Sequence, residues 1–153
     1  MNSVETQIDL VGEVFGVVGR FRRRIRRSAG RGLESARLTE SQSELLWLVG
    51  RRPGISVRAA AAELGLVPNT ASTLVSKLVA NGLLIRTVDD TDRRACHLRL
   101  AEPTQQLVDS SRVARRTLIS ELLNELDDEQ IDSLTKGLEV LDMMTRRLQE
   151  RRS

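Results

Sequence analysis

The sequence predicts a mainly α-helical fold with one small β-hairpin. Two observations carry this prediction. Apolar residues recur at helical spacing through most of the 153 residues, and they alternate at strand spacing only between residues 83 and 100. A third observation concerns the number of domains. A chain of this length, with 40% apolar and 29% charged residues, suits one domain with its own core. We therefore expect a single domain over residues 1–153.

The first segment, roughly residues 4–28, predicts a long amphipathic helix. It contains no proline, and its apolar residues lie mostly at the helical period, with Val11, Phe15 and Val18 forming one stripe. Arginines crowd its last turns, where cations oppose the negative end of the helix dipole. They are Arg22, Arg23, Arg24, Arg26 and Arg27.

Two further helices are delimited by their end signals. The first opens at Thr39, which has Gln42 three residues on as its capping-box partner, and Gly50 and Pro53-Gly54 close it. The second is short and spans residues 57–64, with Gly65 as its stop. We expect a tight turn between this helix and the next.

The fourth helix is expected over residues 68–80. Pro68 fits its first position, because the missing N–H has no intrahelical partner there, and Asn81-Gly82 is a stop signal. One side is apolar, and the other carries short polar groups and one cation without any acid. These are Asn69, Thr70, Ser72, Thr73, Ser76 and Lys77, and together with Pro68 they are the candidate DNA contacts of this helix. Such groups fit a DNA major groove and a phosphate, whereas the alternative interpretation is a solvated polar face.

Strand-like alternation over residues 83–88 and again over residues 96–100 predicts a hairpin. Its polar loop contains Asp92, Arg93 and Arg94. Two helices joined by a tight turn and followed by a hairpin form the plan of a winged helix-turn-helix. The hairpin is then the wing.

Two long helices close the chain, one starting at Pro103 and one capped by Asp127 or Asp128. The last helix carries an apolar stripe that is nearly a heptad repeat. Its members are Ile131, Leu134, Leu138, Leu141 and Leu148. A core within residues 39–101 cannot cover this stripe and the stripe of the first helix, so we expect a second copy to cover both in a homodimer.

The net charge of +3 hides an asymmetry. Residues 1–100 carry 16 basic and 10 acidic groups, whereas residues 101–153 carry 8 and 11. Of the 24 basic residues 22 are arginine, which suits phosphate and base edges but equally fits a GC-rich genome. The cluster from Arg20 to Arg31 has three interpretations: DNA phosphates, an effector carboxylate, or a solvated helix end.

Enzyme, metal and membrane functions are disfavoured. Cys96 and His97 are the only cysteine and histidine, and they lie on opposite faces of one strand, so we expect no catalytic residues, no metal and no cofactor. Cys96 is interpreted as a small buried hydrophobe, with redox sensing as the alternative. No apolar run approaches the ~20 residues of a membrane span, and the acidic start is not a secretory signal. The expected location is cytoplasmic.

Several segments resemble the MarR family of bacterial transcription regulators. The resemblance covers essentially the whole chain, and the wing string, Asp92-Arg93-Arg94-Ala95 followed by Leu98-Arg99-Leu100, is its most specific part. The other matching segments are Leu38-Thr39 with the helix after it, residues 57–65, and Asn81-Gly82-Leu83-Leu84-Ile85-Arg86.

This resemblance implies a homodimer in which residues 39–101 form the DNA-binding core and residues 1–30 and 103–153 form intertwined dimerisation helices. It implies that the helix over residues 68–80 enters the major groove and that Arg94 enters the minor groove from the wing, with Asp92 holding the wing in shape. Many relatives bind small aromatic acids between the dimer and DNA-binding regions. With no Tyr, two Phe and one Trp, any such pocket here is expected to be mainly aliphatic.

Three departures from the family pattern are visible. Ala101 stands where a threonine usually opens the next helix, Thr104 replaces a frequent glycine, and the wing loop lacks the common proline.

The prediction is a sequence-specific double-stranded DNA-binding transcription regulator, a repressor that binds a pseudo-palindromic promoter site as a homodimer. Release by a small-molecule effector is left open. The alternative is a winged-helix protein–protein interaction module without specific DNA binding. Such a module would be expected to lose arginines at the wing or to gain acids on the fourth helix, and neither has happened.

Overall fold

The computed structural model describes residues 3–28, 33, 37–88 and 96–151, and only the backbone of residues 3–8. It confirms a mainly α-helical fold with a small sheet. In chain order the elements are α1 (Ser3–Ser28), α2 (Glu40–Arg51), β1 (Ile55–Ser56), α3 (Val57–Leu64), α4 (Pro68–Ala80), β2 (Leu84–Val88), β3 (Cys96–Leu100), α5 (Glu102–Asn124) and α6 (Asp128–Glu150).

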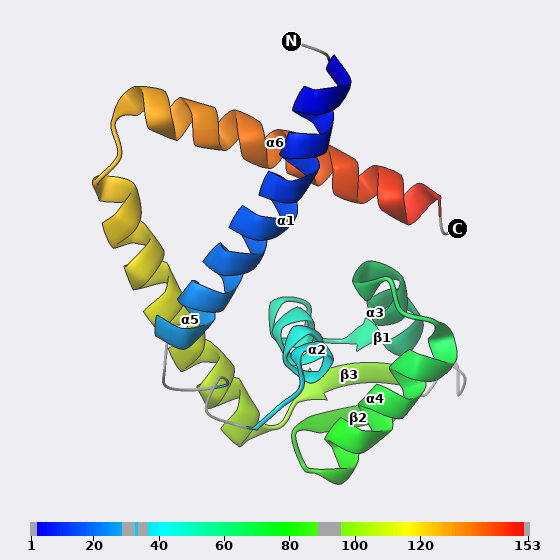
Figure 1. Cartoon of the computed structure of the whole chain (residues 1–153). Coiled ribbons are helices and arrows are strands. Elements are labelled where there is room, and N and C mark those ends of the chain that lie inside the picture. The colour runs from blue at the N-terminus through cyan, green and yellow to red at the C-terminus, as the bar shows by residue number, and fades with distance from the viewer. Residues whose placement is uncertain (1–2, 29–32, 34–36, 89–95, 152–153) are drawn as a thin grey trace.

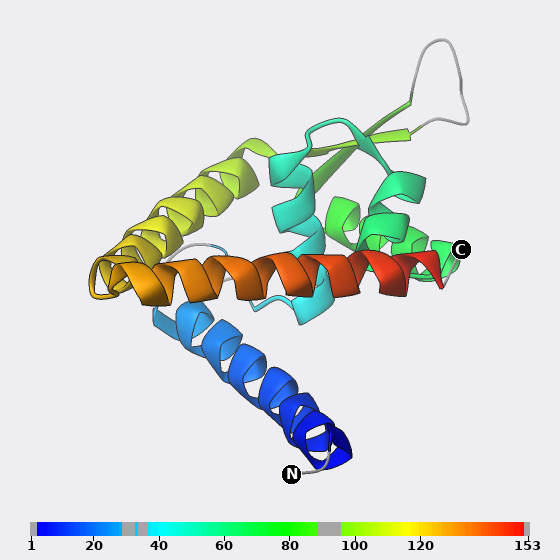
Figure 2. The same cartoon turned by 90° about the horizontal axis from the view of Figure 1, so that it is seen from above.

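The molecule has a winged core, made of α2, β1, α3, α4, β2 and β3, and a frame of three long helices, α1, α5 and α6. Figure 1 shows α5 leaving the core and turning sharply into α6, while the C-terminal end of α1 lies beside α5. Seen from above in Figure 2, α1 and α6 diverge and do not pack along each other. Much of the surface of these helices is therefore uncovered in a single chain.

The sheet has three antiparallel strands in the order β1-β3-β2. The predicted hairpin is present, with Leu84 opposite Leu100 and Val88 opposite Cys96. The strand β1, which pairs Ile55 with Leu98, was not predicted. A two-residue strand has no alternation to detect, so the expected two-stranded hairpin is in fact one edge of a three-stranded sheet.

The apolar core lies between α2, α4 and the sheet. Most of its members come from residues 39–101, but Leu33 precedes that range and Val108 follows it on α5, and both are 1% exposed or less. The other buried apolar residues are Leu45, Leu46, Leu48, Val49, Ile55, Ala60, Val75, Leu78, Leu84, Leu98 and Leu100. The winged core is thus completed by the segments that lead into and out of it.

The predicted capping box of α2 is present. Thr39 Oγ1 accepts a hydrogen bond from the Gln42 N–H at 3.3 Å, and Gln42 Oε1 accepts one from the Thr39 N–H at 2.9 Å. Asp127, not Asp128, caps α6 with Gln130 in the same reciprocal way. The helix α2 ends at Arg51, between the predicted stop signals Gly50 and Pro53-Gly54, and α5 begins at Glu102, one residue before the predicted start.

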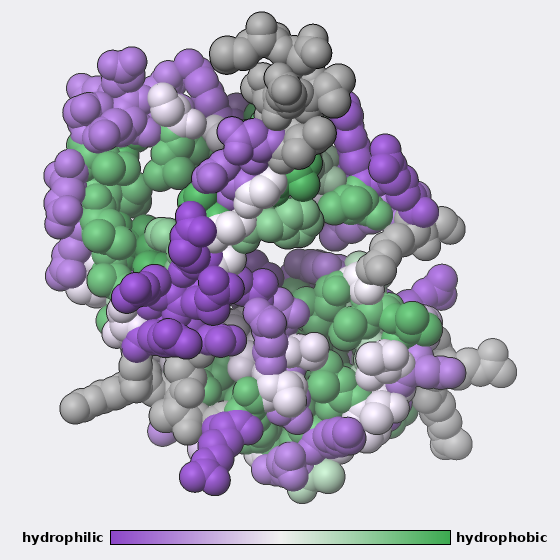
Figure 3. All heavy atoms as spheres, viewed as in Figure 1, coloured by the Kyte–Doolittle hydropathy of each residue, from purple (hydrophilic) through white to green (hydrophobic). Residues whose placement is uncertain are grey.

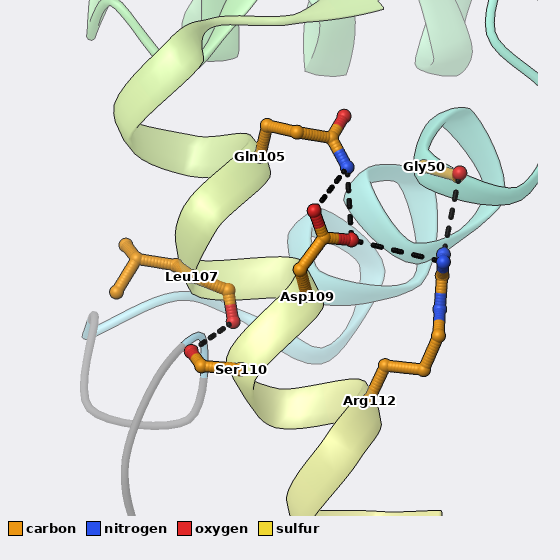
Figure 4. Close-up of polar contacts among 6 residues, drawn as sticks. All are labelled: Gly50, Gln105, Leu107, Asp109, Ser110 and Arg112. Carbon is orange, nitrogen blue, oxygen red and sulfur yellow. Dashed lines mark hydrogen bonds and ion pairs between the residues drawn. The ribbon is translucent and has the colours of Figure 1, made fainter.

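The helix α5 is fastened to the core by consecutive polar contacts. Ser111 Oγ accepts a hydrogen bond from the buried Leu33 N–H at 2.8 Å. Arg112 Nη2 donates to the Gly50 carbonyl at 3.3 Å, near the C-terminal end of α2, where helix carbonyls lack intrahelical partners. Figure 4 shows that Asp109 lies beside Arg112 and accepts from Gln105 at 3.0 and 3.1 Å. These contacts fix the angle at which the frame leaves the core.

Candidate nucleic-acid interface

The helix α4 is held against the core by small and aliphatic side chains. Ala71, Val75 and Leu78 are buried on its inner side. The preceding α3 ends at Gly65, which has φ 64°, a left-handed conformation that glycine adopts without steric cost. This turn directs α4 across the surface of the core, as the sequence predicted.

The outer side of α4 is polar and exposed. Every residue that the sequence assigned to it is exposed, namely Pro68, Asn69, Thr70, Ser72, Thr73, Ser76 and Lys77. The Thr73 hydroxyl donates to the Asn69 carbonyl at 3.0 Å, so its oxygen remains directed outward as an acceptor. No carboxylate belongs to this helix, so the surface suits an anionic partner.

A groove of about 580 Å³ runs between α4 and the start of α2. It adds Thr39 and Ser41 to the candidate interface, two hydroxyl residues that the sequence analysis did not assign to it. The lining residues are Thr39, Ser41, Leu66, Asn69, Thr70, Thr73, Leu74 and Lys77. The groove therefore combines hydroxyls, one amide and one cation, the groups that hydrogen-bond to phosphates and base edges.

The wing carries the second half of the predicted interface. Asp92, Arg93 and Arg94 lie outside the described residues. The two strands that lead to them expose Arg86 and Arg99. These two arginines lie on opposite faces of the hairpin, because Arg86 pairs with Leu98 and Arg99 pairs with Ile85.

The predicted dimerisation stripes are exposed in the single chain. On α1, Phe15 is 78% exposed and Val11 is 57% exposed. On α6, Ile131, Leu134, Leu138 and Leu148 are exposed and Leu141 is partly buried. In Figure 3 apolar residues also gather where α5 turns into α6. Further exposed apolar side chains on the frame are Leu10, Val17, Val18, Phe21, Leu122, Leu123, Val140, Met143 and Met144.

A second cavity, of about 220 Å³, lies where α1, α2 and α5 meet. Two members of the arginine cluster, Arg22 and Arg26, line it, and Arg22 pairs with Glu40 at 3.1 Å and with Glu44. The expectation of a mainly aliphatic pocket is wrong for this cavity, because Phe21 and Trp47 are among its lining residues.

Arg115 and Trp47 form the inner wall of this cavity. The Arg115 guanidinium carbon lies 4.3 Å from the centroid of the Trp47 ring, a cation–π contact. Burial, with the nearby Arg22 and Arg26 charges, lowers the pKa of Arg115. The Trp47 indole N–H is buried and has no acceptor among the described residues. The cavity thus combines aromatic rings with arginines and two carboxylates, those of Glu40 and Glu44.

The remaining candidate residues do not form a site. His97 Nδ1 lies 2.8 Å from the Gly54 carbonyl oxygen, and Cys96 is half-buried. Within the described part of the chain, no three His, Cys, Asp or Glu side chains are grouped so that they could hold a metal ion. Of the described helices, none is both long and apolar enough to cross a membrane.

Comparison with known proteins gives one family. Residues 38–95, which contain the core helices and the start of the hairpin, match the model of the MarR family. No curated protein matches the sequence.

Solved structures share the fold over nearly the whole chain. FabT of Streptococcus pneumoniae in complex with DNA is similar with a TM-score of 0.77 at 17% identity, covering 95% of this chain and 99% of that one. A MarR family protein from Bacillus stearothermophilus gives 0.74 at 20% identity, with coverages of 95% and 99%. RV1404 of Mycobacterium tuberculosis gives 0.70 at 20% identity, with coverages of 89% and 92%.

The family match covers the winged core, and the likeness of fold extends over the long helices on both sides of it. The chain is thus similar to the MarR family over residues 38–95 and has the winged helix-turn-helix architecture of these solved structures.

Proposed function

We propose that the chain is a sequence-specific double-stranded DNA-binding transcription regulator, a repressor that binds a pseudo-palindromic promoter site as a homodimer. The observation that carries this proposal is the exposed outer side of α4, which has hydroxyls, an amide and one lysine but no acid, beside a groove of matching chemistry. The similarity to FabT, whose structure contains DNA, supports it at the level of fold.

The roles of the residues follow from their chemistry. Asn69 and Thr73 have short polar side chains that reach base edges, so they read sequence, whereas Lys77 contacts a phosphate. On the wing, the resemblance to the MarR family implies that Arg94 enters the minor groove and that Asp92 holds the wing in shape, with Arg93 as the weaker neighbour of Arg94. Thr39 and Ser41 add phosphate contacts from the other side of the groove.

The homodimer follows from the exposed stripes. Burying the five stripe side chains of α6 would contribute on the order of 7–15 kcal/mol per chain before entropy costs. A two-fold dimer places two copies of α4 on one side of a duplex, one helical turn or ~10 bp apart. We expect Leu138→Glu to give monomers in sedimentation, and Glu139→Gln, an exposed neighbour, to leave the dimer intact. A stable wild-type monomer at micromolar concentration would contradict the proposal.

The deciding experiment is selection of duplexes from a random pool by the full-length chain. We expect enrichment of paired half-sites and a Kd of order 10⁻⁸ M or tighter at physiological salt. Asn69→Ala and Thr73→Ala should change base preference, each costing ~1–3 kcal/mol at one position per half-site. Lys77→Ala should weaken all sequences about equally and flatten the salt dependence.

The only other lysine, Lys136, supplies a matched control. It is exposed on α6 and pairs with Asp132 at 2.6 Å, away from the α4 surface. Lys136→Ala should leave DNA affinity unchanged. A pool that enriches nothing would favour the alternative function, a protein–protein interaction module.

Release by a small-molecule effector forms part of the proposal. The cavity between α1, α2 and α5 suits an aromatic ring with an anionic group, because Phe21, Trp47 and three arginines are among its lining residues. Trp47 is the only tryptophan, so its fluorescence reports on this cavity directly. We expect benzoate to change that fluorescence saturably and to weaken operator binding, with benzyl alcohol as the uncharged control. Benzoate that leaves both signals unchanged up to millimolar concentration would count against an aromatic acid as effector.

A further inference from the structure

The N-cap residue of α4 differs in chemistry from the N-cap residues of α2 and α3. Thr39 caps α2 and Ser56 caps α3, each through a side-chain oxygen that accepts a backbone N–H. Val67 occupies the corresponding position of α4 and makes no side-chain hydrogen bond. Valine is among the least favourable residues at this position, so helix formation does not explain its presence.

Core packing does not explain it either. Val67 is 66% exposed, so its methyl groups contribute little to the buried apolar interior. A capping side chain normally lies against the third residue of its helix, which here is Thr70. The isopropyl group therefore extends the exposed row of Asn69, Thr70 and Thr73 at the N-terminal end of α4.

That end of a recognition helix is the part that contacts base edges. In the major groove, thymine is distinguished by its 5-methyl group, and apolar side chains recognise it by contact. On the basis of the proposed DNA binding, we propose that Val67 recognises the methyl group of one thymine in each half-site. Val67 is then a specificity-determining residue, and its neighbours supply the hydrogen bonds.

Deoxyuridine scanning tests this directly, because uracil lacks only the methyl group. Duplexes selected by the wild-type chain are remade with each thymine replaced singly by deoxyuridine, and affinities are measured for the wild type and for Val67→Ser. We expect the wild type to lose roughly fourfold in affinity at one thymine per half-site, the effect of one buried methyl group. Val67→Ser should bind thymine and uracil equally at that position.

A control variant and a second Val67 variant complete the test. Val113, on α5, is also 66% exposed, so Val113→Ser removes an equally exposed valine and should retain the fourfold discrimination. Val67→Ala removes the methyl groups without introducing a hydroxyl and should lose the discrimination as Val67→Ser does.

The outcomes separate the two levels of the proposal. If the wild type selects no sequence, the proposed function fails. If it selects a site but no thymine shows a methyl effect, or if Val67→Ser and Val67→Ala keep that effect, the assignment of Val67 is overturned while DNA binding stands.

Discussion

Replacing Gly50 by alanine is predicted to destabilise the fold, although alanine is the better helix former. Gly50 lies in α2 where this helix crosses α5. A Cβ atom built on it would lie 2.9 Å from Val108 Cγ1 and 3.2 Å from Leu100 Cδ1. Val108 is fully buried and Leu100 is 9% exposed, so neither neighbour has open space to move into. The added methyl group therefore overpacks the crossing.

The magnitude follows from two opposing effects. Overpacking of a well-packed core costs about 1–3 kcal/mol, whereas the gain in helix propensity from glycine to alanine is at most about 1 kcal/mol. Their difference is a net loss of up to about 2 kcal/mol in the free energy of unfolding. For a chain of this size, that corresponds to a melting temperature lower by up to roughly 8 °C.

Urea unfolding of a double-mutant cycle measures the effect. Val108→Ala removes the nearest methyl group and leaves a cavity of its own, but in combination with Gly50→Ala the new methyl fills part of that space. The double variant should therefore be more stable than the sum of the single effects by about 1 kcal/mol. Gly137→Ala, on α6, is the control, because no atom of the described residues outside its own stretch of helix lies within 4 Å of its added Cβ, and it should stabilise by up to about 1 kcal/mol. Stabilisation by Gly50→Ala, or strict additivity with Val108→Ala, would refute the reasoning.

Three further changes test other contacts by urea unfolding. Ser111→Ala leaves the buried Leu33 N–H without its acceptor and should cost about 1–3 kcal/mol, whereas Ser110→Ala, at an exposed position, should cost less than about 0.5 kcal/mol. Thr39→Ala breaks the capping box of α2 and should cost about 1 kcal/mol, and Thr39→Ser should restore most of it. Val67→Ser supplies the missing cap of α4 and should add about 1 kcal/mol of stability, so a loss of stability would show that its methyl groups pack in the fold.

Local signals in the sequence were sufficient for the helix boundaries and for the α4 surface. Thr39 with Gln42, and Asp127 with Gln130, interact within four residues, so each cap is readable without knowledge of the fold. The polar side of α4 was readable for the same reason, because helical periodicity separates it from Ala71, Val75 and Leu78. All seven residues assigned to that surface are exposed.

Features that depend on distant segments were not readable. The strand β1 exists because Ile55 and Ser56 meet β3 more than forty residues away. Leu33 and Val108 join the core only because α5 folds back across α2. Neither residue lies in a sequence pattern that indicates its burial. The cavity around Trp47 likewise needs α1, α2 and α5 together, so an aliphatic pocket was the reasonable but incorrect expectation.

The helix α5 links the two halves of the proposed mechanism. Its first half contacts the core through Val108, Ser111, Arg112 and Arg115, and its far end leads directly into α6 and its exposed stripe. In a dimer joined through that stripe, the distance between the two α4 helices depends on the angle between α5 and each core. A duplex offers half-sites at fixed separations, so a small change in this angle displaces both helices from register. Arg115 belongs to this contact and to the wall of the Trp47 cavity. We therefore propose that an anionic effector would change this angle by drawing the Arg115 guanidinium from the indole ring.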